Sequence, residues 1–357
     1  MVLNKKKKIL LAVHNCTFSG APLLGVHLAE AFAKRGYHVF IICLEKGILY
    51  KQFKKSGTIF HAKSLWMSEL IIRMLVRMGI RSVICNTVVT GDIAEIAYKK
   101  GLTVITMIHE LPEAIKSMKA ERKAEKITAF SKYVIFPNYF VKDKFVHLYK
   151  INRDKILVKP QGLYMKIHKG YDEKTKFQKK SDIGIGPNER IVIGIGYGSI
   201  IKGIDLFFKV ASNVHQRDKS IRFIWIGDVD AKFNWVIRMA ERKGILLMPP
   251  SKHIEDYYRI ADLYLLTSRE DSFPSTVLEA IAYGIPVLGF KDAGGFSEID
   301  PKYIKLADYL DCDGMADYVI DITSNNNLQH YFSRDGKQYI KKNFDFQVYA
   351  DFLAGLL

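Results

Sequence analysis

The sequence predicts an α/β protein made of two doubly wound, Rossmann-like domains. Short apolar runs recur along the chain, stretches with helical periodicity separate them, and a charged segment near the middle interrupts the series. Apolar strands that alternate with helices are typical of parallel sheets covered by helices on both faces. A chain of 357 residues is also long enough for two domains that each bury a core. We expect the two domains to face each other across a cleft, with ligands at the carboxyl ends of the strands.

The first domain is expected over residues 1–165. Pro22 and Gly36 mark the start and end of a helix between its first two strands, because proline suits the first turn of a helix and glycine the residue after the last turn. A second helix is expected over 66–80, and a basic one over 113–126. The strands are predicted at 8–13, 39–44, 82–85, 103–108, 133–136 and 156–158.

The second domain is expected over residues 191–340, after a linker at 166–190 and before a C-terminal segment at 341–357. The linker is rich in charged residues and glycine and has no clean periodicity. The C-terminal segment is amphipathic, which predicts a helix. The strands of the second domain are predicted at 191–195, 221–226, 245–248, 263–267 and 285–290.

The whole chain has a formal net charge of +17, and the positive charge is concentrated in its first half. Residues 1–170 hold 30 Lys and Arg against 11 Asp and Glu, whereas residues 171–357 hold 24 against 26. A basic half predicts an anionic partner. Because the sequence has no zinc-knuckle, RNP-like or helix-turn-helix pattern, we expect an anionic membrane surface and no nucleic acid. The segment at 66–80, with Arg73 and Arg77 in an apolar stretch, is either a core helix with an arginine edge or an interfacial helix.

The four cysteines, Cys16, Cys43, Cys85 and Cys312, show neither CxxC pairs nor the spacing of metal ligands. Free cysteines of this kind are small core residues, which suits a reducing compartment. No segment approaches twenty apolar residues, so no transmembrane helix is expected. We therefore expect a cytoplasmic protein that is peripheral on the inner face of the cell membrane, with no metal site.

The most informative stretch is residues 267–299, TSREDSFPSTVLEAIAYGIPVLGFKDAGGFSEI. It places Glu270 and Asp271 after an apolar strand, then a Phe-Pro turn, and then a helix that carries Glu279. The first N–H groups of a helix have no acceptor within it and suit a diphosphate. A carboxylate one turn further along accepts hydrogen bonds from a ribose diol. The stretch predicts a nucleotide-sugar pocket; the alternative is that Glu279 is a solvated helix residue.

This stretch resembles the signature of glycosyltransferase family 4, a family of retaining enzymes with the GT-B fold. The resemblance rests on REDSFPSTVLEAIAYGIPVLGF followed by DAGGFSEI, and extends more loosely over nearly the whole chain. It implies that Glu279 holds the donor's ribose and that Asp271 lies near the donor sugar. The family usually has Glu at the position of Asp271, so the neighbouring Glu270 is a second candidate. The resemblance also implies a final helix that crosses back onto the first domain, and a metal-independent reaction with no cofactor besides the nucleotide-diphosphate-sugar donor.

A glycine-rich loop, GIGYGSIIKG at 194–203, follows the first strand of the second domain. Glycines let a backbone approach phosphate closely, and lysine supplies a compact positive charge. By resemblance Lys202 binds the donor's diphosphate, with Gly198 in the same loop. The family commonly has an arginine at the position of Tyr197, and Arg269 is a candidate replacement for it. Further donor contacts are expected from the start of the following helix, at Ser275, Thr276 and Val277.

In the first domain, His109 and Glu110 follow the strand at 103–108. A histidine at the carboxyl end of a strand is placed to reach a ligand. By resemblance His109 contacts the donor sugar or the acceptor; the alternative is a loop histidine that is hydrogen-bonded locally. Glu110 either serves as the acceptor's base or orients His109. The N–H groups near Gly20, at the start of the first helix, are expected to meet the β-phosphate or the acceptor.

These patterns together predict a retaining hexosyltransferase that moves a sugar from a nucleotide-diphosphate-sugar to a lipid-linked glycan acceptor in surface polysaccharide biosynthesis. Two alternatives stay open: a nucleotide-sugar epimerase of the same fold, and a non-catalytic GT-B subunit that binds a partner or a membrane, which Tyr197 favours. An NAD-dependent dehydrogenase is disfavoured, because Lys-Gly follows Gly198 where that fingerprint has a third glycine. The expected catalytic residues are His109, Asp271, Glu270 and Lys202.

Overall fold

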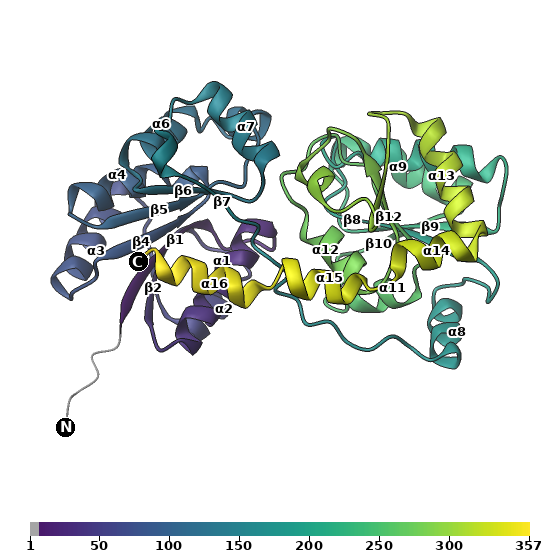
Figure 1. Ribbon diagram of the computed structural model, residues 1–357, viewed down its shortest axis with the longest axis horizontal. Coiled ribbons are helices and arrows are strands. Elements are labelled where there is room, and N and C mark those ends of the chain that lie inside the picture. The colour runs from purple at the N-terminus through teal and green to yellow at the C-terminus, as the bar shows by residue number, and fades with distance from the viewer. Residues whose placement is uncertain (1–6) are drawn as a thin grey trace. The chain divides into compact units, whose positions relative to one another are not determined.

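The computed structural model describes residues 7–357 and divides the chain into two units (Figure 1). Unit 1 comprises the residues up to Tyr164 together with Asp345–Leu357, and unit 2 comprises Met165–Phe344. Residues 1–6, which the predicted first domain includes, lie outside the described residues. Each unit is an α/β layer structure built on its own parallel sheet.

Unit 1 contains a seven-stranded parallel sheet of order β3-β2-β1-β4-β5-β6-β7. The order reverses at β1, which is the mark of a doubly wound sheet. The strands are β1 (Lys8–Asn15), β2 (His38–Glu45), β3 (Thr58–His61), β4 (Ser82–Asn86), β5 (Thr103–Met107), β6 (Tyr133–Phe136) and β7 (Ile156–Val158). The helices are α1 (Gly20–Lys34), α2 (Tyr50–Ser56), α3 (Leu65–Arg77), α4 (Gly91–Lys99), α5 (Pro112–Ser117), α6 (Glu121–Phe130), α7 (Tyr139–Leu148) and α16 (Phe346–Gly355).

Both faces of this sheet are buried, because successive side chains of a strand point to opposite faces. In β1, Ile9, Leu11 and Val13 pack with residues of α1 and α16. Leu10 and Ala12 pack on the other face with residues of α3 and α4. The nearly continuous apolar run of β1 is therefore the expected pattern of a central parallel strand.

Helix α16 completes unit 1 from the far end of the chain, beside α1 (Figure 1). Tyr349 and Leu353 are buried in the same core cluster as Phe32 of α1. At the edge of this contact, Arg35 Nε donates to Asp351 Oδ1 at 2.6 Å. Apolar packing with a polar rim thus fixes the last helix on the first sheet.

Unit 2 contains a six-stranded parallel sheet of order β10-β9-β8-β11-β12-β13. The order reverses at β8, as it does at β1 of unit 1. The strands are β8 (Arg190–Ile195), β9 (Ile221–Ile226), β10 (Ile245–Met248), β11 (Leu263–Leu266), β12 (Val287–Phe290) and β13 (Ile304–Ala307). The helices are α8 (Glu173–Asp182), α9 (Ile204–His215), α10 (Asn234–Lys243), α11 (Ile254–Ile260), α12 (Ser275–Ala282), α13 (Cys312–Ser324), α14 (Asn326–Ser333) and α15 (Gly336–Asn343).

The predicted fold class is confirmed, and the differences lie at its margins. The edge strands β3 and β13 were not predicted, because their sequences, TIFH and IKLA, mix polar with apolar residues. The helix predicted over 113–126 is two helices, α5 and α6. Lys119 between them has φ of 51°, which no helix accommodates.

The linker predicted at 166–190 also differs from the structure, which places these residues in unit 2 and folds part of them into α8. Asp172 caps α8, since its side chain accepts a hydrogen bond from Thr175 N at 2.7 Å. Buried Lys180 donates to Glu189 O at 2.8 Å. The helix escaped prediction because EKTKFQKKSD has too few apolar residues to show a stripe. At the other end of unit 2, the predicted segment 341–357 takes in the last residues of α15 as well as α16.

Candidate functional site

The loop that carries Lys202 is held against the carboxyl end of β11. Gly203 has φ of +67°, and a Cβ on it would lie 1.9 Å from Thr267 O, so only glycine fits. Thr267 Oγ1 donates to Gly203 O at 2.9 Å. This close approach places Lys202 beside the segment that follows β11.

Lys202 Nζ forms an ion pair with Asp271 Oδ2. The carboxylate is buried, at 7% exposed, while the lysine side chain is about one-third exposed. Ser268 Oγ also donates to Asp271 Oδ2, at 3.4 Å. The structure thus brings together the predicted phosphate lysine and one of the two predicted sugar carboxylates. Glu270, the other one, is half-buried next to Asp271.

The segment after β12 fixes the backbone of Asp271. Asp271 N donates to Ala293 O at 2.8 Å, and Gly294 pairs with Asp271 as an isolated bridge. A Cβ on Gly294 would lie 2.0 Å from Asp271 O, which excludes every other residue at this position. The predicted glycine turn therefore serves to hold the acidic residue in place.

Helix α12 begins at Ser275, directly after Pro274. Val277 N donates to Pro274 O at 3.2 Å, while the N–H groups of Ser275 and Thr276 precede the first possible acceptor of the helix. These two N–H groups are the part of the predicted diphosphate site that the helix supplies.

Glu279 lies on the second turn of α12 and is buried, at 7% exposed. Tyr258 of α11, itself 1% exposed, donates its hydroxyl to Glu279 Oε2 at 2.8 Å. Burial raises the pKa of Glu279, and hydrogen bonds with Tyr258 and Ser275 oppose that rise. Among the described residues, no Lys or Arg forms an ion pair with Glu279. The carboxylate is therefore held by hydroxyl groups alone and keeps acceptor capacity for a ligand.

The sequence did not reveal Tyr258, because its role depends on a hydroxyl that meets a residue 21 positions later. The short helix IEDYYRI, with two adjacent tyrosines, gives no hint of which ring points inward. Only the packing of α11 against α12 decides it.

Arg269 is the candidate replacement for an arginine at position 197, and in the structure its side chain pairs with a carboxylate of unit 2. Its guanidinium forms a bidentate pair with Asp205, at 2.8 and 2.6 Å, and also donates to Ile200 O at 2.7 Å. Arg269 thus clamps the glycine-rich loop to the start of α9. Tyr197 is 56% exposed, and Gly198 N donates to Asp228 O at 2.7 Å.

In unit 1, the predicted residues His109 and Gly20 lie near Asn86, at the carboxyl end of the sheet. His109 Nε2 is 3.1 Å from Asn86 Oδ1, and Asn86 Nδ2 donates to Ala21 O at 2.6 Å. Asn86 therefore links the segment after β5 to the first turn of α1. Burial, followed by the nearby His14, lowers the pKa of His109 to about 4.

Glu110 does not point at the ring of His109. Its Oε2 accepts the backbone N–H groups of Val88 and His109, each at 3.1 Å. Burial raises the pKa of Glu110 to about 7, against the effect of these backbone hydrogen bonds. Of the two predicted roles, the contacts fit the orienting one, and Glu110 acts on the backbone of His109.

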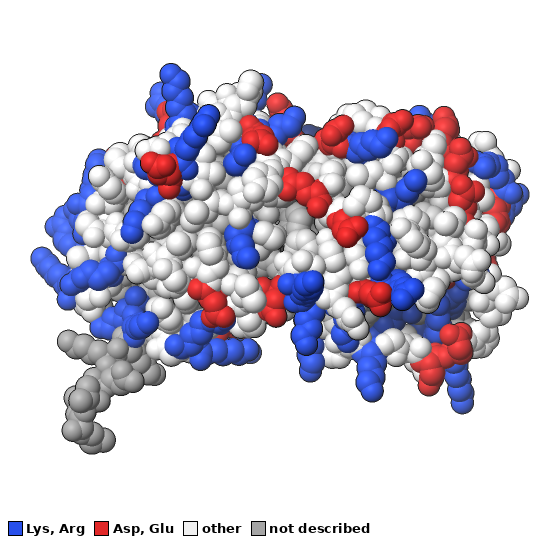
Figure 2. All heavy atoms as spheres, viewed as in Figure 1, with Lys and Arg blue, Asp and Glu red and all other residues white. Residues whose placement is uncertain are grey.

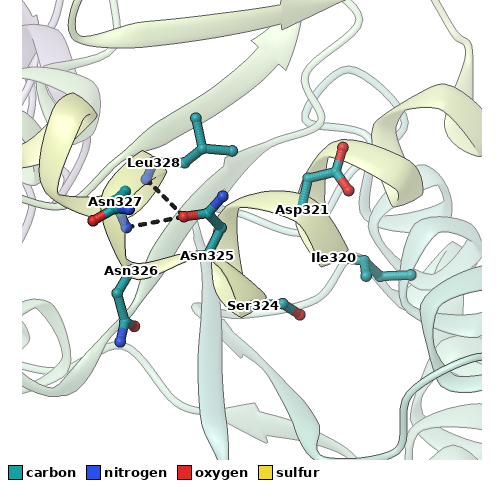
Figure 3. Close-up of a pocket in the computed structure, with 7 residues that line it drawn as sticks. All are labelled: Ile320, Asp321, Ser324, Asn325, Asn326, Asn327 and Leu328. Carbon is teal, nitrogen blue, oxygen red and sulfur yellow. Dashed lines mark hydrogen bonds between the residues drawn. The ribbon is translucent and has the colours of Figure 1, made fainter.

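A shallow hollow of about 570 Å³ lies elsewhere in unit 2, at the turn between α13 and α14 (Figure 3). Asn325 Oδ1 accepts the N–H groups of Asn327 and Leu328 there, at 3.0 and 3.3 Å. None of the predicted site residues lines it. The lining residues are Ile320, Asp321, Ser324, Asn325, Asn326, Asn327 and Leu328.

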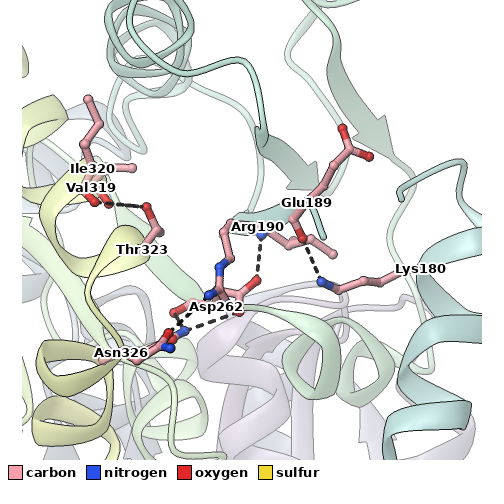
Figure 4. Close-up of polar contacts among 10 residues, drawn as sticks. Lys180, Glu189, Arg190, Asp262, Val319, Ile320, Thr323 and Asn326 are labelled. Atoms are coloured by element: carbon pink, nitrogen blue, oxygen red, sulfur yellow. Dashed lines mark hydrogen bonds and ion pairs between the residues drawn. The ribbon is translucent and has the colours of Figure 1, made fainter. Parts of the chain in front are cut away.

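Next to this hollow, buried Asp262 ties together the amino ends of β8 and β11 (Figure 4). Its Oδ2 accepts Ile191 N at 2.8 Å, and its Oδ1 accepts Arg190 Nη1 at 3.3 Å. Arg190 Nη2 also donates to Asn326 Oδ1 at 3.1 Å. This network is at the opposite end of the strands from Lys202 and supports the fold.

Among residues 7–357, no group of three or more His, Cys, Asp and Glu side chains is arranged to hold a metal ion. Within the same range, no helix is both long enough and apolar enough to cross a membrane.

Comparison with known proteins connects this geometry to a family. Residues 175–339 match the family model of glycosyl transferases group 1. D-inositol 3-phosphate glycosyltransferase from Nocardia farcinica is 29% identical over 164 residues, which is 43% of this chain and 36% of that protein. Amylovoran biosynthesis glycosyltransferase AmsD from Erwinia amylovora is 24% identical over 155 residues, 43% of this chain and 40% of AmsD. The alignments thus span well under half of the length of either relative.

A solved structure extends the likeness to the whole fold. Alr3699/HepE from Anabaena, in complex with UDP and glucose, superposes with a TM-score of 0.81 over 98% of both chains, at 15% sequence identity. At that identity the likeness concerns the fold. The family match, over less than half of the chain, thus connects unit 2 with glycosyl transferases group 1, and both units together have the predicted GT-B fold.

Proposed function

We propose that the protein is a retaining hexosyltransferase that transfers a sugar from a nucleoside diphosphate sugar to a lipid-linked glycan. The observation that carries this proposal is the ion pair between Lys202 and Asp271, just before helix α12, which carries the buried carboxylate of Glu279. In unit 2, Lys202 suits a diphosphate, Asp271 suits a sugar, and Glu279 suits a ribose.

The donor's diphosphate would take over the ammonium group of Lys202. In the structure Asp271 balances that charge. When phosphate oxygens replace Asp271 at Lys202, the carboxylate is released to accept hydrogen bonds from sugar hydroxyls. The N–H groups of Ser275 and Thr276 add donors for the second phosphate. Donor binding and the freeing of Asp271 are thus one event.

The donor's ribose would bind Glu279. Tyr258 and Ser275 occupy part of the carboxylate, and the remaining lone pairs suit the two hydroxyls of a ribose. Because burial excludes competing water, hydrogen bonds made here are stronger than at the surface.

Transfer breaks the bond between the anomeric carbon and the leaving diphosphate oxygen, and it forms a bond from that carbon to an acceptor oxygen. The acceptor's proton passes to the departing diphosphate on the same face, so the configuration is retained. The protein's part is to stabilise the negative charge that develops on the diphosphate, through Lys202 and the start of α12.

A glycan acceptor in polysaccharide assembly agrees with the relative named for amylovoran biosynthesis. An acceptor on a lipid carrier requires the enzyme to work at a membrane surface. Figure 2 shows Lys and Arg side chains gathered on the part of unit 1 that carries α3, α4 and α6. Such a surface attracts anionic lipid headgroups.

Helix α3 offers the docking face for that membrane. It packs on unit 1 through Ile72 and Leu75, while Trp66 is 68% exposed on the outer side. Arg73 and Arg77 are exposed among its apolar side chains. A tryptophan and apolar residues flanked by arginines suit an anionic lipid interface. The further exposed apolar residues of this face are Leu65, Leu70, Met74 and Met78.

Nucleotide binding tests the donor site. Thermal unfolding is measured with UDP, GDP, dTDP and ADP, for the parent, Lys202→Ala and the control Lys209→Ala, which changes an exposed lysine on α9. One diphosphate at a hundred times its Kd is expected to add about 2.7 kcal/mol to the parent and the control. The Lys202→Ala variant should lose most of this gain. Equal stabilisation of all three proteins would refute the role of Lys202.

Vesicle binding tests the membrane face. The parent should bind phosphatidylglycerol vesicles at low salt with a blue shift of tryptophan emission, and high salt should release it. Trp66→Phe should abolish the blue shift, whereas Trp235→Phe, a control in unit 2, should keep it. Equal binding to phosphatidylcholine vesicles at either salt concentration would argue against docking by charge.

A non-catalytic GT-B subunit is the second candidate, because Tyr197 stands where the family usually has arginine and Arg269 is bound to Asp205. Such a subunit would bind a nucleotide without transferring sugar. Nucleotide stabilisation without release of diphosphate, with any combination of donor sugar and lipid-linked acceptor, would favour it over the enzyme.

A further inference from the structure

The amide of Asn86 is fixed by its two partners. Asn86 ends β4 and is 1% exposed, and its Nδ2 lies 2.6 Å from Ala21 O. A backbone carbonyl only accepts hydrogen bonds, so the amide nitrogen must face Ala21. The amide oxygen of Asn86 then faces His109, at 3.1 Å from Nε2.

This orientation decides which nitrogen of His109 carries a proton. The oxygen of Asn86 only accepts, so Nε2 of His109 must donate and therefore bears the hydrogen. A neutral imidazole has one N–H, which leaves Nδ1 with a free lone pair. Burial lowers the pKa of His109 to about 4, with His14 adding to the effect, so the ring is neutral at physiological pH.

The backbone of His109 is fixed as firmly as its ring. Glu110 accepts the N–H groups of His109 and Val88, which ties the segment after β5 to the short helical turn Val88–Thr90 after β4. The ring of His14 is the titratable neighbour on β1, and its Nδ1 lies 3.4 Å from Thr87 Oγ1. Among the interactions of the described residues, none involves Nδ1 of His109.

We propose that Asn86 is a positioning residue that holds His109 in the Nε2–H form, so that Nδ1 accepts a hydrogen bond from a hydroxyl group of a bound sugar. This inference rests on the proposed function, since it names the kind of group that His109 recognises. A lone pair repels carboxylate and phosphate oxygens. Unit 1 therefore selects a hydroxyl at this point and disfavours an acidic sugar that would place its carboxylate here.

The tautomer is read directly by long-range ¹H–¹⁵N correlation spectra of the ¹⁵N-histidine-labelled full chain. His109→Gln identifies the signals of His109 among the ten histidines. At neutral pH the spectrum of the parent should show a protonated Nε2 and an unprotonated Nδ1. A proton on Nδ1, alone or together with one on Nε2, would overturn the proposal without the need for any variant.

Kinetics test the positioning role. In Asn86→Leu, of similar size, kcat should fall about tenfold, the effect of one lost hydrogen bond, while the Kd of the nucleoside diphosphate stays within about twofold because unit 2 binds it. In the same variant, hydrogen exchange at Nε2 should speed up. An unchanged kcat in a folded Asn86→Leu protein would overturn the role of Asn86 and leave the proposed function standing. Absence of transfer by the parent would overturn both the proposed function and the hydroxyl contact.

Discussion

Replacing Tyr258 with phenylalanine tests how the buried carboxylate of Glu279 is tolerated in unit 2. The change removes one oxygen, which donates to Glu279 Oε2 at 2.8 Å. The ring itself stays, together with its stacking on Tyr283, where the centroids are 5.4 Å apart and the planes differ by 9°. Any effect of Tyr258→Phe therefore reports on the hydroxyl.

The free energy of unfolding that Tyr258→Phe loses depends on the charge of Glu279. A hydrogen bond to an ionised group contributes about 1.5–3 kcal/mol, against about 1 kcal/mol for a neutral pair. Burial raises the pKa of Glu279 and the bond from Tyr258 lowers it, so the loss of the hydroxyl moves that pKa further up. At a pH above this value, Tyr258→Phe should cost about 2–3 kcal/mol; below it, where Glu279 is protonated, the cost should shrink to about 1 kcal/mol.

The sign of the pH dependence follows from linkage. A carboxyl group whose pKa is raised in the folded protein binds its proton more tightly there than in the unfolded chain. The free energy of unfolding therefore falls as pH rises from the unfolded to the folded pKa. In Tyr258→Phe this window reaches to higher pH than in the parent, so the two stability curves diverge as pH rises.

Urea unfolding at a series of pH values measures the effect. A Trp66→Phe background leaves Trp225 and Trp235 as reporters, both in unit 2. Tyr264→Phe is the matched control, since it removes a buried hydroxyl that donates to uncharged Thr276 Oγ1 at 2.8 Å. The control should lose about 1 kcal/mol at every pH. A pH-independent loss for Tyr258→Phe, equal to that of the control, would refute the reasoning.

Two further predictions concern the framework of the site. Gly203→Ala would place a Cβ 1.9 Å from Thr267 O, so the loop must move and nucleotide affinity should fall at least about tenfold. The control Gly244→Ala is also at positive φ but has open space around it. This control should keep its nucleotide affinity and lose about 1 kcal/mol of stability. Nucleotide titrations of both variants decide this, and equal affinities would contradict it. Asp262→Ala should lower the unfolding free energy by about 2–3 kcal/mol, because it leaves the backbone N–H of Ile191 in β8 without its acceptor and removes one partner of the Arg190 guanidinium. Asp317→Ala, which breaks an exposed ion pair, should change it by less than about 1 kcal/mol in the same urea experiment.

The central strands were predictable because they are buried on both faces. The strands at 133–136 and 221–226 have the bounds that their apolar runs predict. Edge strands were predictable only where they are wholly apolar: β7 (ILV) and β10 (ILLM) were predicted, whereas β3 (TIFH) and β13 (IKLA) mix polar with apolar residues and were not. The left-handed turn at Lys119 is another feature that no local pattern revealed, because lysine rarely adopts it.

The candidate site was predictable residue by residue, but its contacts were not. The spacing within one segment pointed to Asp271 and Glu279. The pairing of Asp271 with Lys202 joins residues 69 positions apart and depends on the order of strands β8 and β11. The pairing of Arg269 with Asp205 likewise joins residues of different elements, and the position of Arg269 in the sequence did not reveal it. Partners that come from distant elements emerge only from the folded arrangement.

The place of α16 has a consequence for how the chain is made. Unit 1 is interrupted in sequence by the whole of unit 2, and it buries Phe346, Tyr349 and Leu353 in its own core. At about 5–20 residues per second, a ribosome needs about 10 to 40 seconds to make unit 2. During that time the apolar surface around Phe32 has no cover from α16, so unit 1 has to wait for the synthesis of residues 345–357. Chains cut short before Asp345 would keep that surface exposed and are natural targets for chaperones and proteases.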